Sequence, residues 1–259
     1  MYIFEGKCNE SGLFFKNLFD MLVQLSPISN GTNACIRQAC FKIDALGLQI
    51  YTSVNNNVWV SSQFESQNFS TFNITIPEIN IGANLELVKN FFKNTKKQDH
   101  VTFKVISDEC GNPSELEICI LKKDQDMSVT NVLNIQTVQS ENLDYEGRLS
   151  NPINFKSSEF ATMCRNIHHI NFVEISFSPF GAKFFFNIND VSRTTVTVGD
   201  VNKKYDFTEQ FNASFIKNIN KLATFSQTLK MYAMPKQPLV LESKIGTIGS
   251  VRVWIKPTN

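Results

Sequence analysis

Apolar residues recur at helical spacing in four segments of the chain, and shorter apolar runs lie between these segments. The spacing of three and four residues predicts helices over 11–25, 83–96, 157–169 and 212–225. Alternating or continuous apolar runs predict strands in the intervening sequence. These strands are expected at 2–7, 34–43, 48–52, 58–64, 71–76, 101–107, 115–122, 129–136, 152–156, 173–176, 193–198, 205–207, 229–233, 239–242 and 251–256.

The order of the predicted elements repeats along the chain. Each half reads strand, helix, strands, helix and strands, and a hairpin turning at Gly47 is repeated by one at Gly181. Many strands with few helices indicate an α+β fold, in which helices pack on one face of antiparallel sheet. We therefore expect two similar domains with two helices each, at 1–136 and 151–259. The polar stretch 137–150 is the expected connecting loop.

Lysines follow the same short apolar pattern in both halves. Val88 to Lys93 in the first half is echoed by Ile216 to Lys221 in the second. An α-helix turns about 100° per residue, so each helix is expected to have one lysine face and one apolar face. Repeated positive charge on a regular scaffold is suited to holding a polyanion. The alternative is that these are ordinary lysines on solvated helix faces.

Charge placement gives this pattern weight, because the chain as a whole is nearly neutral. The net charge of the 259 residues is +1. Segment 85–97 carries +3 and segment 212–225 carries +2, so the rest of the chain carries −4. A nucleic-acid role must therefore come from local charge and not from global basicity.

Motifs for catalysis, metal binding and membrane insertion are missing from the sequence. The six cysteines form no CxxC pair, and no glycine-rich phosphate loop or GxSxG motif is present. His168 and His169 are adjacent, so on a helix they point in different directions and make a poor metal site. The amino terminus lacks a signal-peptide pattern, and no apolar run could span a membrane. We therefore expect an intracellular, non-enzymatic protein with reduced thiols, no cofactor, no metal and no membrane partner.

Several segments resemble one family in the same order along the chain. They are 158–170 (SEFATMCRNIHHI), 238–245 (PLVLESKI), 249–257 (GSVRVWIKP), Phe4-Glu5, and Phe41-x-Ile43 followed by Gly47. These segments resemble the proliferating cell nuclear antigen family of eukaryotic and viral DNA sliding clamps, and the resemblance covers nearly the whole chain. It implies a ring of subunits around duplex DNA, with helices lining the hole and sheets forming the outer wall.

The resemblance implies which basic residues face the DNA. The implied pore-facing residues are Lys16, Lys89, Lys93, Lys96, Lys97, Arg165, Lys217 and Lys221. The first helix departs from the family, because Phe15 and Leu22 stand where lysines are usual.

The resemblance also implies a subunit interface and a groove for client peptides. The implied interface residues, on two edge strands, are Val129, Asn131, Leu133, Ile135, Arg193, Thr195 and Thr197; the alternative is that both strands are internal. The implied groove residues are Ser53, Asn57, Leu143, Tyr145, Pro238, Trp254, Lys256 and Pro257. Ser53 and Asn57 stand where the family more often has methionine and histidine. The alternative interpretation of Trp254 is that it is an ordinary core residue and not part of a binding surface.

The expected partners follow from the same resemblance. They are double-stranded DNA bound without sequence preference, a DNA polymerase and other replication and repair proteins bound through short peptide motifs, a clamp loader, and two further copies in a homotrimer. A nuclear location is implied, or a cytoplasmic replication site if the chain is viral. The alternatives are a subunit of a heterotrimeric checkpoint-type clamp, a monomeric processivity factor held by charge, and an unrelated α+β protein. Pro179 stands where many members carry a modified lysine.

Overall fold

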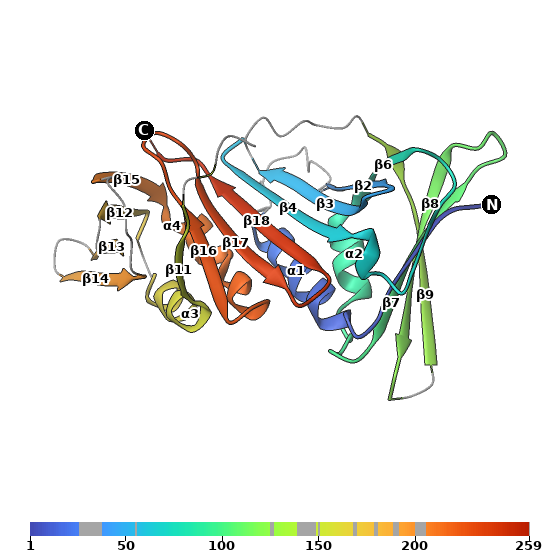
Figure 1. The fold of residues 1–259 in the computed structure, drawn as a ribbon, viewed down its shortest axis with the longest axis horizontal. Helices are drawn as coiled ribbons and strands as arrows, with labels where there is room; N and C mark the ends of the chain where they lie inside the picture. Colours follow the sequence, from blue (N-terminus) through green and yellow to red (C-terminus); the bar gives the residue numbers. More distant parts are fainter. Residues whose placement is uncertain are drawn as a thin grey trace, which may run out of the picture. The chain divides into compact units, whose positions relative to one another are not determined.

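The computed structural model describes residues 1–25, 38–54, 56–124, 127–138, 149, 151–167, 170–178, 181–188, 192–199 and 206–258 (Figure 1). The helices are α1 (Gly12–Leu25), α2 (Leu85–Phe91), α3 (Ser157–Asn166) and α4 (Ala213–Asn218), with 3-10 helices η1 (Ser66–Asn68) and η2 (Asn220–Thr224). The strands are β1 (Tyr2–Cys8), β2 (Gln38–Asp44), β3 (Gly47–Val54), β4 (Val58–Glu65), β5 (Thr71–Ile74), β6 (Glu78–Asn84), β7 (His100–Ser107), β8 (Pro113–Lys122), β9 (Met127–Asn134), β10 (Gln136–Thr137), β11 (Ile153–Lys156), β12 (Phe172–Ser178), β13 (Gly181–Ile188), β14 (Ser192–Val198), β15 (Phe207–Asn212), β16 (Thr228–Tyr232), β17 (Leu239–Ile245) and β18 (Gly249–Ile255). The predicted α+β composition, with few helices and mostly antiparallel sheet, is confirmed.

The chain divides into two compact units, and neither is a single stretch of sequence. Unit 1 comprises Met1–Thr52, Ser61–Asn142 and Ile245–Ser250, and unit 2 comprises Ser53–Val60, Leu143–Lys244 and Val251–Asn259. Strands β4 and β18 contribute residues to both units. The predicted domain limits at 136 and 151 remain a prediction. Residues 139–148 of the expected connecting loop lie outside the described residues.

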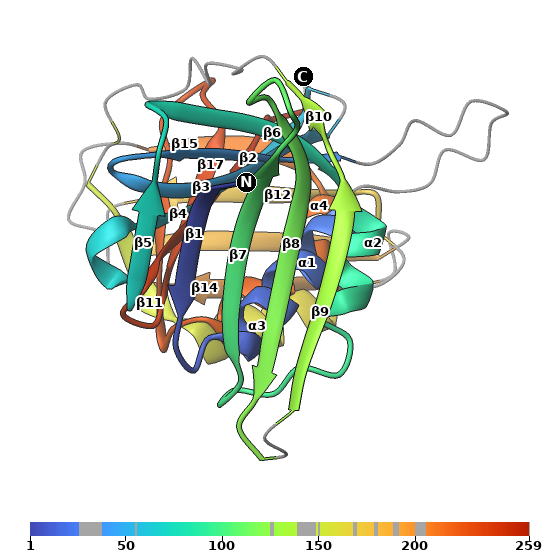
Figure 2. The same ribbon diagram turned by 90° about the vertical axis from the view of Figure 1, so that its right-hand side faces the viewer.

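Unit 1 contains an antiparallel five-stranded sheet in the order β5-β1-β7-β8-β9. Figure 2 shows these five strands side by side, with α1 and α2 behind them. A second antiparallel run joins β10, β6, β2 and β3. Within the described part of the chain, β9 is therefore an edge strand of the five-stranded sheet.

The core of unit 1 is rich in phenylalanine. Phe15 of α1 is fully buried, and its ring lies 5.1 Å from Phe64, 6.0 Å from Phe92 and 4.9 Å from Phe103 between centroids. Phe19 stacks on Phe92 at 5.2 Å one helical turn later. Each such ring contributes about 1.5–3 kcal/mol through burial, so these rings hold α1 against the strands and the end of α2.

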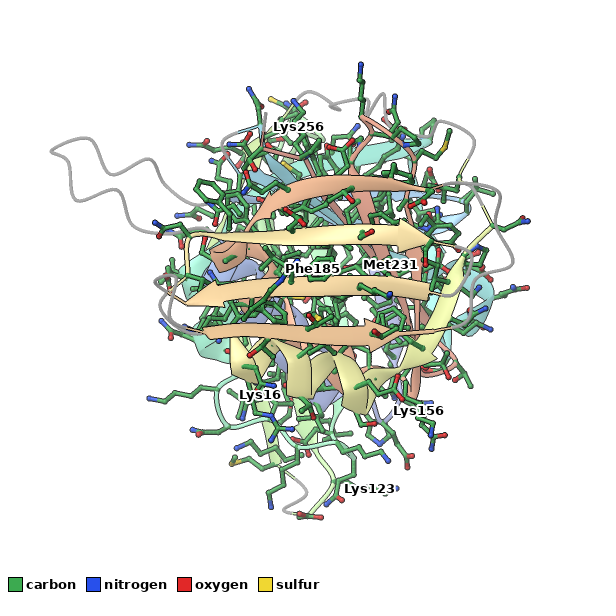
Figure 3. All side chains as sticks on the ribbon, turned by 90° about the vertical axis from the view of Figure 1, so that its left-hand side faces the viewer. Lys16, Lys123, Lys156, Phe185, Met231 and Lys256 are labelled. Atoms are coloured by element: carbon green, nitrogen blue, oxygen red, sulfur yellow. The ribbon has the colours of Figure 1, made fainter. Side chains whose placement is uncertain are left out.

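Unit 2 contains an antiparallel four-stranded sheet in the order β14-β13-β12-β15, seen face-on in Figure 3. A further antiparallel run joins β17, β16 and β11. Strand β14 is an edge strand within the described residues. On this sheet the Arg193 guanidinium lies 4.6 Å from the centre of the Phe185 ring, which Figure 3 labels.

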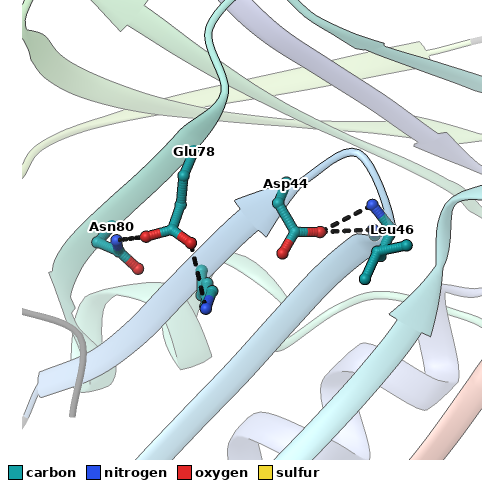
Figure 4. Close-up of polar contacts among 6 residues, drawn as sticks. Asp44, Leu46, Glu78 and Asn80 are labelled. Carbon is teal, nitrogen blue, oxygen red and sulfur yellow. Dashed lines mark hydrogen bonds and ion pairs between the residues drawn. The ribbon is translucent and has the colours of Figure 1, made fainter. Parts of the chain in front are cut away.

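The predicted repeated hairpins are both present, and both need their glycine. A Cβ on Gly47 would lie 2.0 Å from the Phe64 carbonyl oxygen, and one on Gly181 would lie 2.3 Å from the Gly199 carbonyl oxygen. In the β2–β3 turn, Asp44 Oδ1 accepts hydrogen bonds from Leu46 N at 2.8 Å and Gly47 N at 3.2 Å (Figure 4). This carboxylate bonding is typical of an Asx turn.

The predicted helix over 83–96 is wrong at both ends. Ala83 and Asn84 close strand β6, which the sequence did not predict, and α2 ends at Phe91. After α2, Lys93 N bonds to Asn90 O at 3.2 Å and Thr95 N bonds to Phe92 O at 3.0 Å. These tight turns replace the helix, so Lys96 and Lys97 do not share a helical face with Lys89.

The other predicted helices are also shorter than expected. The segment 212–225 forms α4 followed by the 3-10 helix η2, so Lys217 and Lys221 belong to different elements. Helix α3 ends at Asn166. The histidine pair His168–His169 lies outside the described residues, as does Pro179.

Candidate nucleic-acid interface

The two lysine-bearing helices begin in the same way. Asn84 Oδ1 accepts from the backbone of Glu86 at 3.0 Å and Leu87 at 3.2 Å at the start of α2. Asn212 Oδ1 accepts from Ser214 N at 2.9 Å at the start of α4. Each asparagine ends a strand and satisfies backbone donors of the first helical turn, which is why the helix starts there.

Both helices have an apolar side and a lysine side, as their sequences predict. Leu85 and Val88 of α2 are fully buried, and so are Ala213 and Ile216 of α4. Lys89 is half-buried and lies 3.9 Å from the Glu86 carboxylate, and Lys217 is exposed. The lysines therefore lie on the solvent side of each helix.

A hydrogen bond between Lys16 and Lys93 links α1 to the segment that follows α2. Lys16 Nζ donates to the Lys93 backbone carbonyl at 2.8 Å, while the Lys93 side chain is exposed. A lysine amine near a helix carboxyl end satisfies a carbonyl that has no helical partner. In this arrangement the Lys16 ammonium is hydrogen-bonded to the backbone, and the Lys93 ammonium is exposed to solvent.

Arg165 of α3 lies against its own helix. Its Nε donates to Ala161 O at 3.3 Å and its Nη2 donates to Thr162 Oγ1 at 3.2 Å. The side chain is nevertheless exposed. Lys221 in η2 is half-buried.

The first helix has Phe15 and Leu22 where the family usually has lysines, and the structure gives the reason. Phe15 and Leu22 are both fully buried, so these two positions belong to the core of unit 1. A lysine at either position would place a charge in that core without a partner, which is strongly unfavourable. Helix α1 therefore offers Lys16 alone among its residues as a cation.

Strand β9 has one side turned to strand β8 and a free edge. Ile135 N donates to Ser114 O at 3.1 Å, so alternate residues counted back from Ile135 bond to β8. Asn131 and Leu133 lie in that set, together with Val129; Leu133 is 6% exposed and the other two are half-buried. The backbone groups of Thr130 and Val132 point away from β8.

Strand β14 also carries its predicted residues on an edge. Arg193, Thr195 and Thr197 are exposed there, opposite Asn187, Phe185 and Lys183 of β13. Both strands thus have the position that pairing between subunits requires, and the interface itself remains a prediction.

One predicted groove residue, Trp254, belongs to an aromatic cluster: it is 7% exposed and packs with Trp59, Tyr232 and Val240. Ser53 and Asn57 are exposed, and Pro238, Lys256 and Pro257 are half-buried. Leu143 and Tyr145 lie outside the described residues.

Lys256 is tied to this cluster. Its backbone N–H donates to Asn57 O at 2.9 Å, and its Nζ lies 4.8 Å from the centre of the Trp59 ring. Such a contact between an ammonium and a ring face is worth about 0.5–1 kcal/mol at an exposed site. Trp59 and Lys256 are therefore neighbours that the sequence pattern gave no reason to pair.

Two lysines that sequence reasoning missed lie beside predicted ones. Lys122 and Lys123 end β8 and begin the turn to β9, and Asp124 of this turn lies 3.0 Å from Lys96 Nζ. The signal in the sequence was the Lys-Lys pair at the end of an alternating strand, equal in form to Lys96-Lys97.

The described residues contain no group of three or more His, Cys, Asp or Glu side chains arranged to hold a metal ion. Among the helices that the structure describes, none is both long and apolar enough to cross a bilayer.

The chain is similar in sequence to viral and animal proteins. It is 26% identical to the uncharacterized protein 436R of Invertebrate iridescent virus 6, over 98% of this chain and 92% of that protein. It is 23% identical to the probable DNA polymerase sliding clamp of Acanthamoeba polyphaga mimivirus, over 78% of this chain and 45% of that protein. It is 22% identical to proliferating cell nuclear antigen 2 of Drosophila melanogaster, over 95% of this chain and 94% of that protein. No protein-family model matches the chain.

Of these distant relatives, the viral one is named a probable DNA polymerase sliding clamp and the animal one a proliferating cell nuclear antigen. They support a relation to the sliding clamps of the proliferating cell nuclear antigen type. The mostly antiparallel α+β structure is compatible with that fold.

Proposed function

We propose that the protein is a DNA sliding clamp, a non-catalytic processivity factor that encircles duplex DNA as a homotrimer. The names of the mimivirus and Drosophila relatives support a role of this kind. The observation that carries the proposal is the repeated unit of strand, asparagine cap and short lysine-bearing helix, which occurs at β6–α2 and again at β15–α4.

A protein that slides needs contacts that do not depend on base sequence. A good bidentate bond to a base edge discriminates by about 1–3 kcal/mol and would stop movement at each matching site. Lysine–phosphate attraction is independent of sequence and weakens with salt. Lys89, Lys93, Lys217 and Lys221 supply such contacts, with Lys16 and Arg165 as minor members because each also bonds to backbone.

Ring closure requires a head-to-tail contact whose rotation brings the last subunit back to the first. Strand β9 of one subunit and strand β14 of the next are the proposed pair, since each is an edge strand. Topological closure then keeps the protein on DNA without tight binding.

The other partners are part of the same proposal. The rim around the Trp254 cluster, formed by Ser53, Asn57, Pro238, Lys256 and Pro257, is the proposed docking place for short peptide motifs of a polymerase and other replication or repair proteins. A clamp loader opens the ring, and the site of action is the nucleus or a viral replication site.

Retention on circular DNA tests the proposal. A closed ring stays on nicked circular duplex through washing and is lost once the circle is cut, because it slides off the ends. We expect the double variant Lys89→Glu/Lys217→Glu, with one change in each helix, to assemble normally but to be loaded onto the circle poorly, because reversed charge repels phosphate. The matched control is Lys236→Glu/Lys244→Glu, at exposed positions that belong to none of the proposed surfaces.

Equal retention on circular and linear DNA contradicts the clamp and favours a factor held by charge alone. Loading of the Lys89/Lys217 variant onto the circle as efficiently as the control contradicts the assignment of the helix lysines.

A further inference from the structure

Four lysines from two loops of unit 1 form a cluster that is separate from helices α2 and α4. We name it the loop-lysine cluster: Lys96 and Lys97 from the connection between α2 and β7, and Lys122 and Lys123 from the end of β8 and the turn to β9. Figure 3 labels Lys123, whose side chain extends outward from the chain.

Two carboxylates join the loops of this cluster. Asp124 accepts from Lys96 Nζ at 3.0 Å and from the Gln98 side-chain amide. Glu10, in the turn between β1 and α1, accepts from Lys123 Nζ at 2.7 Å. Three segments far apart in sequence are therefore held side by side. Lys96, Lys97 and Lys123 are exposed and Lys122 is half-buried.

The backbone beneath Lys96 and Lys97 is fixed by a buried carboxylate. Asp99 is 1% exposed, and its Oδ2 accepts from Lys96 N at 2.7 Å. Its carbonyl oxygen accepts from Ser11 N and Gly12 N, both at 3.1 Å. A Cβ on Gly12 would lie 2.3 Å from Thr95 Cγ2 and 2.5 Å from Lys96 O. The segment between α2 and β7 therefore packs directly against the start of α1.

A fixed backbone matters for a charged surface. Binding costs less when the groups that contact the ligand are already in place, since less conformational entropy is lost. The loop-lysine cluster is therefore a prepared surface and not a set of lysines on a loose tail.

The cluster retains free positive charge. Within the described residues, Lys97 and Lys122 form no ion pair. The pairs Lys96–Asp124 and Lys123–Glu10 have exposed side chains, so solvent weakens each ion pair and a phosphate can replace the carboxylate. The hydrogen bond and charge of Asp124 raise the pKa of Lys96, and those of Glu10 raise the pKa of Lys123, so each carboxylate favours the charged form of its lysine.

We propose that the loop-lysine cluster is a second contact surface for the phosphates of duplex DNA, outside the lysine helices. This inference rests on the proposed function. It joins Lys96 and Lys97, which the resemblance already implied as DNA-facing, with Lys122 and Lys123, which it did not, in a contact that only the first half of the chain provides. The segment that follows η2 in the second half, Ser226-Gln227, has no lysine where the first half has Lys96-Lys97.

The chemistry of the surface favours duplex over single-stranded DNA. Proteins that hold single strands stack the bases on aromatic side chains. Residues 93–99 and 121–127 contain no aromatic residue, whereas they contain five lysines, including Lys93. Ammonium groups alone suit a phosphate backbone whose bases are already stacked and paired.

Salt-dependent binding to a labelled linear duplex tests the inference, with the affinity of the full chain measured by fluorescence anisotropy. The variant is Lys97→Gln/Lys122→Gln, which removes two charges and leaves no carboxylate without its partner. The matched control is Lys236→Gln/Lys244→Gln, with the same change of charge at exposed positions of unit 2. Each lost lysine–phosphate contact reduces the slope of log affinity against log salt by about 0.9, so we expect the variant's slope to fall by about 2 and the control's to stay unchanged.

A slope and affinity equal to those of the control overturn the inference. Loss of binding to polyglutamate without a change in the DNA slope also overturns it, and assigns the surface to an acidic protein partner. Failure of this inference is distinguishable from failure of the proposed function, because the helix variant Lys89→Glu/Lys217→Glu and the circular-DNA retention are measured separately.

Discussion

Buried aromatic residues decide which positions of the first helix can carry charge. Phe15 lies among Phe64, Phe92 and Phe103 with its ring fully covered, and Leu22 is covered as completely. A lysine at either position would require a charge in an apolar core, so helix α1 contributes little to a basic surface. The positive charge of unit 1 is concentrated instead on α2 and on the loops that follow it.

Burial also decides which cysteine thiols can react. Burial raises the pKa of Cys8 and of Cys164 to about 12, whereas Cys110 is exposed on the β7–β8 turn. A raised pKa keeps a thiol protonated, and only the thiolate is nucleophilic, so at pH 8 about one in 10,000 of these two thiols is ionised. We expect iodoacetamide to modify Cys110 in the native protein and to reach Cys8 and Cys164 only after denaturation.

Mapping of the modified cysteines by mass spectrometry checks this expectation. Modification of Cys8 and Cys164 as fast as Cys110 at pH 8 would contradict the packing of β1 and α3 described above.

At the scale of elements, the direction of each backbone N–H on β9 decides what a proline does there. Asn131 bonds to Ile118 of β8 in the alternation that Ile135 and Ser114 fix, whereas the N–H of Thr130 points to the free edge. Leu133 belongs to the same set as Asn131, so a proline at Leu133 would damage the sheet itself and would be a poor probe of assembly.

Adjacent proline variants therefore separate assembly from folding. We expect Thr130→Pro to fold normally and remain monomeric, because proline removes only a donor offered to another subunit. We expect Asn131→Pro to lower the free energy of unfolding by about 1–3 kcal/mol, because it leaves a carbonyl of β8 without its donor. Chemical denaturation and native mass together check both variants. A Thr130→Pro variant that keeps the assembled mass of the unaltered chain would show that β9 is not the interface.

Element lengths also show where sequence reasoning succeeds and fails. Helix α1 and the hairpins at Gly47 and Gly181 could be predicted, because strong apolar spacing and a required glycine act locally. The end of α2 could not be predicted from apolar spacing. The Lys96 N–H, which a continued helix would use, donates instead to the side chain of Asp99. Strand β6 was missed because its half-polar sequence, 78–84, acquires its strand character from pairing with β2 along its whole length.

The candidate site divides in the same way. The lysines of α2 and α4 could be found from periodicity, since the opposite faces of both helices are buried by local pattern. Lys122 and Lys123 could not, because only the contacts of Asp124 with Lys96 and Gln98 bring the two loops together. The contact between Trp59 and Lys256 could not be predicted either, because the two residues are far apart in sequence.

At the scale of the whole molecule, the proposed function requires three copies of this chain to close into a ring. Light scattering of the purified chain, at several concentrations and salt levels, tests this requirement most directly. We expect a native mass near three times 29.4 kDa that persists in moderate salt, because backbone pairing between strand edges is less sensitive to salt than surface ion pairs. A chain that remains at 29.4 kDa throughout would contradict the self-sufficient ring.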